Sequence, residues 1–304
     1  MLVVKFGGSS VGTAERILAA ARIVAGHRAQ TPVVVVVSAM AGVTDALIRV
    51  ANAVLAGQPP WWDDLAALEQ RHRQTYLEIA GKVPEAFGRE WARMEAAAQA
   101  LAARACSQAS AAREIRRFSG WGERLVVDLF AAGLRREGIK ASAFSGEPVL
   151  LANVAEEAEP SVLATRAWLL PQLAGALAQD AVPVLPGYIA LDASGQSTTL
   201  GRNGSDHSAA VVAAALGAQA LYIYSDVAGV YTADPRVVAD AQLLPRLSYR
   251  EVAEIAAAGA RVLHPRAVEP LARWGIPLYL RSSFAPSAPG TDILPLEERD
   301  ELSA

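Results

Sequence analysis

The chain has 304 residues, 52% hydrophobic and 19% charged, so it can bury a sizeable core and is not intrinsically disordered. Its 28 Lys and Arg against 31 Asp and Glu give a net charge of −3, which provides no electrostatic case for binding nucleic acid or an anionic membrane. The single cysteine, Cys106, excludes an intrachain disulfide and a cysteine-rich metal site. No apolar run approaches the roughly 20 residues of a membrane span, and Met1–Lys5 is not typical of a signal peptide. At roughly 150 residues per domain, the length indicates two domains or one large α/β unit.

The first quarter of the sequence alternates short β-branched runs with helical patterns. Leu2–Phe6 and Pro32–Val37 are predicted strands, and the five consecutive valines of the second are typical of a strand buried on both faces. Thr13–His27, with Thr13 as its N-cap, and Thr44–Leu55 are predicted helices. This β-α-β-α order implies a parallel sheet covered by helices.

The stretch from Pro60 to Arg117 contains no strand candidate. It is rich in Ala, Glu, Gln and Arg, and apolar residues such as Leu65, Leu68 and Tyr76 recur at helical spacing. We interpret residues 60–117 as a helical insertion, whose simplest role is that of a solvated cap without chemistry.

The α/β pattern then resumes. Helices are predicted over Gly122–Glu137 (ending at Gly138), Ser161–Gln179 and Asp206–Leu216, and others start at the capping box Ser248–Glu251 and at Pro265. Strands are predicted over Ala141–Phe144, Val182–Leu185, Ala220–Tyr224 and Pro277–Arg281, with a hairpin of Tyr188–Leu191 and Ser197–Leu200 around Asp192–Gly195. The polar, Pro-rich composition after Pro286 predicts a tail over 286–304.

A first loop with chemical potential is Lys5–Gly12, between a predicted strand and a predicted helix. Gly7 and Gly8 let the backbone approach a ligand, the helix N-terminus offers free N–H groups, and Lys5 adds a positive charge. Together these features suit phosphate, although neither the Walker A nor the G-x-G-x-x-G spacing is present. The alternative is a glycine-rich turn beside a solvated lysine.

The same loop also matches the G-x-S-x-G pattern of α/β-hydrolases at Gly8–Gly12. That interpretation would make Ser10 a nucleophile with a base such as His264. The hydrolase oxyanion hole, however, needs a loop from an earlier strand, and no strand is predicted before Leu2–Phe6, so the hydrolase interpretation is the weaker one.

Two later loops also follow predicted strands. In Thr198–Asp206, Arg202 can bind a carboxylate through two hydrogen bonds, and Asp206 can orient Lys5 or hold Mg²⁺, while a simpler role for Ser205 or Asp206 is to cap the next helix.

The loop Ser225–Arg236 lies at the carboxyl end of a parallel strand, where open α/β sheets bind ligands. Asp226 and Tyr231 are candidates for contacts with a ribose and a base, and Arg236 with phosphate. The alternative is a turn-rich connection without a ligand.

Taken in order, these segments resemble the aspartate kinases of the amino acid kinase superfamily, from Leu2 to about Ile293. Lys5–Gly12 is similar to the family's K-F-G-G-[TS]-S-V-G loop, Ser38–Thr44 to S-A-x-x-G-x-T, Gly122–Glu123 to G-E, Gly201–Asp206 to G-R-G-G-S-D, Ser225–Arg236 to T-D-V-x-G-[VI]-Y-T-x-D-P-R, and Gly259–Pro265 to G-A-K-V-L-H-P.

The resemblance implies the amino acid kinase fold, an α/β structure with a mostly parallel central sheet sandwiched between helices. It implies an aspartate-binding N-terminal lobe over 1–200 that includes the helical insertion, a nucleotide-binding C-terminal lobe over 201–293, and a tail over 294–304. The implied activity is ATP-dependent phosphorylation of the β-carboxylate of L-aspartate, the first step toward lysine, threonine and methionine. ATP, Mg²⁺, a homodimer and a cytoplasmic location are expected with it.

The resemblance also implies a role for each site residue. Phosphoryl transfer to a carboxylate needs no general base, so catalysis should consist of positioning and charge neutralisation. Lys5, Gly7 and Gly8 would neutralise the transferred phosphate, and Asp206 would organise Lys5. The aspartate contacts would come from Glu123 to the ammonium, Arg202 to a carboxylate, and Ser38, Thr44 and Ser205. The nucleotide contacts would come from Ser9, Ser225, Asp226, Tyr231, Arg236 and Arg261.

The sequence departs from the family pattern in a few places. Arg261 stands where the family has Lys, which keeps the charge but replaces a compact ammonium with a planar fork, and Asn203 and Ser225 replace Gly and Thr. The family usually continues into two ACT domains that bind end-product amino acids, whereas a short tail follows Ile293, so we expect no ACT-mediated feedback inhibition. Two alternatives stay open: a kinase for another carboxylic amino acid, and a non-catalytic nucleotide-binding subunit.

Overall fold

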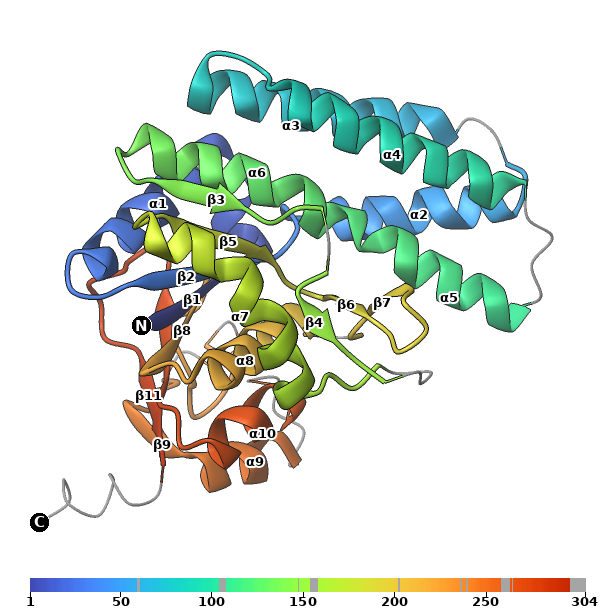
Figure 1. The fold of residues 1–304 in the computed structure, drawn as a ribbon. Coiled ribbons are helices and arrows are strands. Elements are labelled where there is room, and N and C mark those ends of the chain that lie inside the picture. The colour runs from blue at the N-terminus through green and yellow to red at the C-terminus, as the bar shows by residue number, and fades with distance from the viewer. Residues whose placement is uncertain are drawn as a thin grey trace, which may run out of the picture.

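The computed structural model describes residues 1–58, 61–103, 108–146, 148–153, 158–201, 203–235, 237–238, 240–257, 263 and 265–295. Within them an eight-stranded sheet and a small three-stranded sheet form the framework (Figure 1). The large sheet has the order β3 (Ala141–Ala143), β5 (Val182–Pro186), β2 (Val33–Val37), β1 (Leu2–Phe6), β8 (Ala220–Ser225), β10 (Leu278–Ser282), β11 (Thr291–Leu294), β9 (Arg246–Ser248). The small sheet has the order β4 (Leu150–Leu151), β6 (Ile189–Leu191), β7 (Ser197–Thr199).

The centre of the large sheet is parallel and buried on both faces, as its valine-rich strands predict. Every ladder from β3 to β10 is parallel, and β11 pairs with β10 in the antiparallel direction. Val4 and Val35 contribute to one hydrophobic core and Val3 and Val34 to the other. This alternation places an apolar layer on each face, and helices cover both layers.

Helices of different character cover the two faces. On one face α1 (Ala14–Arg28) and α6 (Trp121–Arg136) pack on β1, β2, β3 and β5, while on the other α7 (Val162–Ala178) and α8 (Gly204–Leu216) pack on the same centre. The small alanine side chains of α8, all buried, let it lie close to β1 and β8. Two short helices, α9 (Tyr249–Ala257) and α10 (Pro265–Arg273), complete that face, with α10 packed on α8.

The helical insertion has the predicted character. Its described residues form α3 (Trp61–Ala80), α4 (Glu85–Ala102) and α5 (Gln108–Ser119), with no strand among them. These helices pack on α2 (Val43–Leu55) and α6, and Figure 1 shows α3 and α4 as an outer layer above α2 and α6, with α5 on the other side of α2. The lobe boundary near residue 200 stays a prediction. The large sheet includes strands from both sides of it, since β1 pairs with both β2 and β8.

Several local predictions are confirmed, and the predicted tail is wrong in part. Thr13 caps α1 by accepting a hydrogen bond from the Arg16 N–H at 3.2 Å, and the Ser248–Glu251 capping box forms as expected. The predicted tail over 286–304 contains strand β11, where Ile293 is fully buried. A four-residue strand inside a polar stretch is too short to produce a recognisable alternation, and the two-residue β4 and three-residue β9 were missed for the same reason.

No helix among these described ranges is long and apolar enough to cross a membrane.

One aromatic contact ties α6 to the sheet and gives a stability test. Phe130 of α6 is fully buried, and its ring centroid lies 5.3 Å from that of Phe6 in β1. We expect Phe130→Ala to lower the free energy of unfolding by about 3–5 kcal/mol, because it removes apolar contacts and leaves a cavity. Urea unfolding followed by circular dichroism measures the loss. Leu163→Ala in α7, where the side chain is 67% exposed, should cost less than about 0.5 kcal/mol, and equal losses would contradict this account of the core.

Candidate active site

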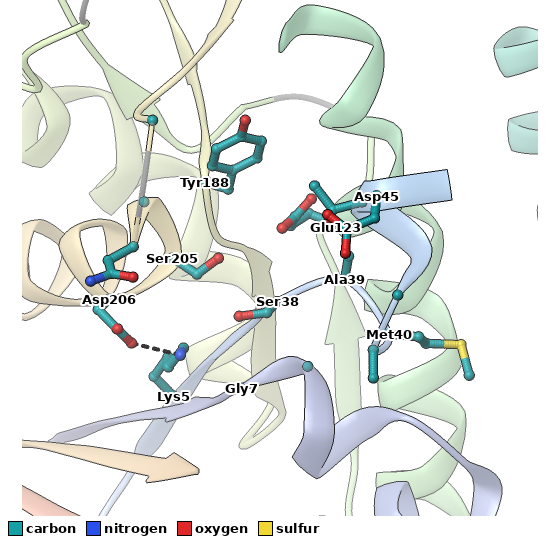
Figure 2. Close-up of a pocket in the computed structure, with 17 residues that line it drawn as sticks. Lys5, Gly7, Ser38, Ala39, Met40, Asp45, Glu123, Tyr188, Ser205 and Asp206 are labelled. Carbon is teal, nitrogen blue, oxygen red and sulfur yellow. Dashed lines mark ion pairs between the residues drawn. The ribbon is translucent and has the colours of Figure 1, made fainter. Parts of the chain in front are cut away.

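A cleft of about 580 Å³ opens at the carboxyl ends of β1, β2 and β5. Because parallel strands end at the same edge of a sheet, loops far apart in the sequence meet there. Figure 2 shows side chains from all of these loops facing the same space. The lining residues are Lys5, Gly7, Gly8, Ser38, Ala39, Met40, Ala41, Gly42, Thr44, Asp45, Glu123, Tyr188, Gly201, Asn203, Gly204, Ser205 and Asp206.

The first wall of the cleft is the loop that follows β1. The Gly7 N–H donates to the carbonyl of Tyr224 in β8 at 3.0 Å, and the chain then makes a short 3₁₀ turn over Gly8–Val11 before α1. A Cβ on Gly8 would lie 2.8 Å from the carbonyl oxygen of Ala39 in the neighbouring loop. Glycine is therefore required at position 8 for the two loops to touch, and their backbones line the cleft together.

Lys5 and Asp206 form the predicted ion pair inside the cleft. The Lys5 Nζ lies 2.6 Å from the Asp206 Oδ1, and the whole Lys5 residue is only 6% exposed (Figure 2). A cation is thus held near the backbone of Gly7, whose Cβ position would lie 3.6 Å from Nζ.

Glu123 lies on the opposite side of the cleft, in the first turn of α6 (Figure 2). It is 3% exposed, and its Oε2 has no hydrogen-bond partner. Burial raises the pKa of Glu123 to about 8, against the opposing effects of the backbone N–H groups of Ala39 and Glu123 and of the Lys5 charge. A buried, incompletely satisfied carboxyl facing a cleft is suited to a cationic ligand group.

Two helices begin at the cleft, but not at the residues expected from the sequence. The N-cap of α2 is Gly42, with φ of +79°, and the N-cap of α8 is Asn203, with φ of +55°. The capping role suggested for Ser205 or Asp206 is therefore wrong, because the left-handed Asn203 starts α8 earlier, and Gly42 likewise starts α2 before Thr44. Neither cap makes a side-chain hydrogen bond, so both helix N-termini present backbone N–H groups near the cleft.

Two lining residues were missed by sequence reasoning, Tyr188 and Asp45. Tyr188 has φ of +64°, its N–H donates to the Ser208 Oγ at 2.8 Å, and its hydroxyl lies 3.2 Å from the Ser119 Oγ. Asp45 is an exposed residue in the first turn of α2, on the same side as Glu123 in Figure 2. The Pro186–Gly187 pair, directly after a predicted strand, indicates a turn at the edge of the sheet, and this was the sequence feature that could have identified Tyr188.

The predicted nucleotide residues that the structure describes lie apart from this cleft. Ser225 ends β8, beside β1 in the same sheet, and its hydroxyl forms a turn with Val227. Asp226 is exposed, and Tyr231 is half-buried and bridges to Leu243. None of these residues, nor Ser9, lines the cleft, although Ser225 and Asp226 reach the same edge of the sheet. Arg202, Arg236 and Arg261 fall outside the described residues.

The hydrolase alternative does not fit the described geometry. Ser10 is 1% exposed, and its hydroxyl lies 2.7 Å from the Ser283 Oγ, away from the cleft lining. Its suggested partner, His264, lies outside the described residues, as does Cys106.

Fold and cleft define a class: an α/β protein with a mostly parallel sheet, whose strand ends carry a lysine and glycine-rich loops beside helix N-termini. Residues 1–282 match the model of the amino acid kinase family, and the chain belongs to that family.

Its relatives include the aspartokinase of Rickettsia felis, 32% identical over 96% of this chain and 60% of the relative, and aspartokinase 3 of Arabidopsis thaliana, 34% identical over 96% of this chain and 52% of the relative. Among solved structures it is similar to Escherichia coli aspartokinase III in complex with aspartate and ADP, with a TM-score of 0.85, 32% identity, and coverage of 97% of this chain and 64% of that one. The chain thus spans between about half and two thirds of the length of these proteins. The expected absence of ACT-mediated inhibition stays a prediction.

The contact between the first two loops can be tested with a matched pair of glycine substitutions. Gly8→Ala should lower the melting temperature and disturb the cleft, since its Cβ would meet the Ala39 carbonyl, whereas Gly7→Ala finds its nearest neighbours at 3.6 Å. We expect a cost of about 1–3 kcal/mol for the first and less than about 1 kcal/mol for the second. Thermal unfolding of both variants checks this, and equal stabilities would show that the loops do not need the close approach.

The buried carboxyl of Glu123 makes stability depend on pH. Its pKa rises from 4.5 to about 8 on folding, so the folded state binds more protons between these values. Wild-type stability should therefore fall as pH rises through this window. Glu123→Gln lacks this titration. As pH rises through the window, its free energy of unfolding relative to wild type should increase by up to about 1.4 kcal/mol for each pKa unit of the shift.

Urea unfolding at about pH 5 and about pH 8 measures this difference. Glu85→Gln is the control, because the Glu85 side chain is 96% exposed and should show no pH-dependent change relative to wild type. If Glu123→Gln tracks wild type at both pH values, Glu123 is ionised normally in the folded protein.

Proposed function

We propose that this chain transfers the γ-phosphoryl group of ATP to the β-carboxylate of L-aspartate, giving 4-phospho-L-aspartate and ADP. The observation that carries the proposal is the charge arrangement of one cleft, with the Lys5–Asp206 pair on one side and the buried Glu123 carboxyl on the other. An amino acid with a free ammonium and a side-chain carboxylate is complementary to both. The similarity to an aspartokinase crystallised with aspartate and ADP supports the same assignment.

The reaction requires positioning and neutralisation of charge rather than a base. A carboxylate oxygen of aspartate forms the new bond to phosphorus while the bond to the ADP oxygen breaks, and no proton is transferred. Lys5 and the backbone of Gly7 and Gly8 neutralise charge on the transferred group. Asp206 fixes Lys5, because its carboxylate holds Nζ at 2.6 Å. In a water-excluded site one such contact contributes about 3 kcal/mol, or roughly a hundredfold in rate.

Aspartate is held by groups on both sides of the cleft. The substrate ammonium lies against Glu123, whose pKa burial raises to about 8. The positive charge of the bound ammonium favours the ionised form of this carboxyl. Ser38, Thr44 and Ser205 line the cleft and supply hydrogen bonds, and Arg202 binds a carboxylate of the substrate. Of these, Ser38 and Ser205 lie between Lys5 and Glu123 in Figure 2, where the body of a small amino acid would fit.

The nucleotide occupies the same edge of the sheet beyond β1. Its contacts are Ser9, Ser225, Asp226, Tyr231, Arg236 and Arg261. All but Ser9 lie in the segment 201–293, to which we assign nucleotide binding, and we assign aspartate binding chiefly to 1–200. The described residues contain no cluster of three or more His, Cys, Asp or Glu suited to a metal ion. Mg²⁺ is commonly bound by one or two carboxylates plus substrate phosphates, so it would bind together with ATP and would supply positive charge to the phosphates. A homodimer in the cytoplasm, acting in aspartate-family amino acid synthesis, completes the proposal.

The experiment is aspartyl hydroxamate formation from ATP, Mg²⁺, L-aspartate and hydroxylamine. Wild type should form product, and Lys5→Ala should lose about a hundredfold or more in kcat, since the cation at the transferred phosphate is gone. Lys82→Ala, an exposed lysine after α3, should keep wild-type activity. Glutamate and N-acetylglutamate serve as competing acceptors. Product only with another acceptor, or ATP binding without any product, would overturn the assignment to aspartate.

A further inference from the structure

Arg71, in the middle of α3, contacts two of the loops that form the cleft, and it does not itself line the cleft. Its Nη1 donates to the carbonyl of Ala41 at 2.8 Å, and its Nη2 donates to the carbonyl of Gly12 at 2.9 Å. Gly12 follows the 3₁₀ turn after β1, and Ala41 lies in the loop after β2. One guanidinium therefore bridges the loop that follows Lys5 and the loop whose Ala39 contacts Glu123.

These two carbonyls need a donor from outside their own loops. Ala41 immediately precedes the left-handed N-cap Gly42, and Gly12 ends the 3₁₀ turn, so each lies where the regular hydrogen-bonding pattern breaks. The loops already meet once, where the Ala41 N–H donates to the Gly8 carbonyl at 3.1 Å. The Arg71 guanidinium adds one hydrogen bond to each loop. These two bonds and the Ala41–Gly8 bond together fix the relative orientation of the two loops.

The helix holds Arg71 firmly enough to act as a fixed support. The Thr75 hydroxyl donates to the Arg71 carbonyl at 2.8 Å, and the neighbouring His72 is fully buried. Burial lowers the pKa of His72 to about 4, so the imidazole beside Arg71 is neutral at physiological pH, and its Nδ1 lies 2.7 Å from the Leu68 carbonyl oxygen. Helix α3 also packs on α1, α2 and α6, the helices that follow the two loops and carry Glu123.

We propose that Arg71 is a positioning residue for phosphoryl transfer, which holds the Gly7–Gly12 loop and the Ser38–Gly42 loop in the relative geometry that the reaction needs. The helical insertion is then part of the active-site scaffold rather than an inert cap. A misplacement of about 1 Å by a remote substitution can cost about a hundredfold in rate. Lysine cannot replace the fork, since a single ammonium cannot reproduce its planar, two-point geometry.

The kinetic test compares Arg71→Ala and Arg71→Lys with Arg73→Ala, an exposed residue of the same helix that pairs with Glu69 at 2.7 Å. We expect Arg71→Ala to lower kcat about ten- to hundredfold, Arg71→Lys to lower it less, and Arg73→Ala to stay near wild type. Guanidinium ion added far below denaturing concentrations should partly restore kcat of Arg71→Ala but not of Lys5→Ala. Wild-type kcat in Arg71→Ala, or an equal loss in Arg73→Ala, would overturn the proposal.

The kinetic arm rests on the proposed function, so a second measurement stands apart from activity. Hydrogen–deuterium exchange of the backbone amides in residues 7–13 and 38–43 should be faster in Arg71→Ala than in wild type or Arg73→Ala. If wild type forms no aspartyl hydroxamate while exchange responds as expected, the assignment to aspartate fails and the positioning role stands. If exchange in both loops is unchanged in a folded Arg71→Ala protein, the positioning role fails.

Discussion

The site depends on one close approach, that of the loop after β1 to the loop after β2. The two strands are parallel neighbours, so their carboxyl ends place the loops side by side, and the absence of a side chain at Gly8 lets the backbones touch. Without that contact neither loop would line the cleft in its present position. A glycine at position 122 extends the same principle to α6, since a Cβ there would lie 2.7 Å from the Ala39 Cβ. Glu123 reaches the cleft because its preceding residue has no side chain.

The second constraint is electrostatic. Lys5 and Glu123 are both nearly buried, and each would be costly without a partner. Lys5 has Asp206, whereas Glu123 keeps one oxygen without a hydrogen bond and has a raised pKa. This difference between the two groups bears on function. Lys5 is paired with a carboxylate of the protein, whereas one oxygen of Glu123 is left to contact a ligand. With the proposed function, we expect such a cleft to favour a ligand that brings its own positive charge over acylated amino acids that lack one.

The sequence predicted those parts of the structure that local patterns determine. The valine run predicted β2, and Thr13 predicted the start of α1. The order of the motifs predicted that Lys5, Glu123 and Asp206 lie in one site, and all three line the cleft. It failed where a single backbone conformation decides the outcome. Asn203 adopts a left-handed conformation that L side chains rarely take, and this moves the start of α8 away from the residues whose side chains favour caps. Tyr188 was missed in the same way, since its place in the cleft follows from a positive φ rather than from a pattern.

Arg71 shows why the helical insertion could not be understood from its own sequence. Its fork reaches carbonyls 30 and 59 residues away, and nothing in an amphipathic helix distinguishes that arginine from Arg73, which forms an ordinary pair within the helix. The buried face of α3 fixes the distance between the helix and the loops, and the side chain then spans that distance. An active site built on loops needs rigid support from regular elements, and here the sheet holds one end of each loop while α3 holds the other. The insertion therefore contributes to function through geometry, although none of its described residues lines the cleft.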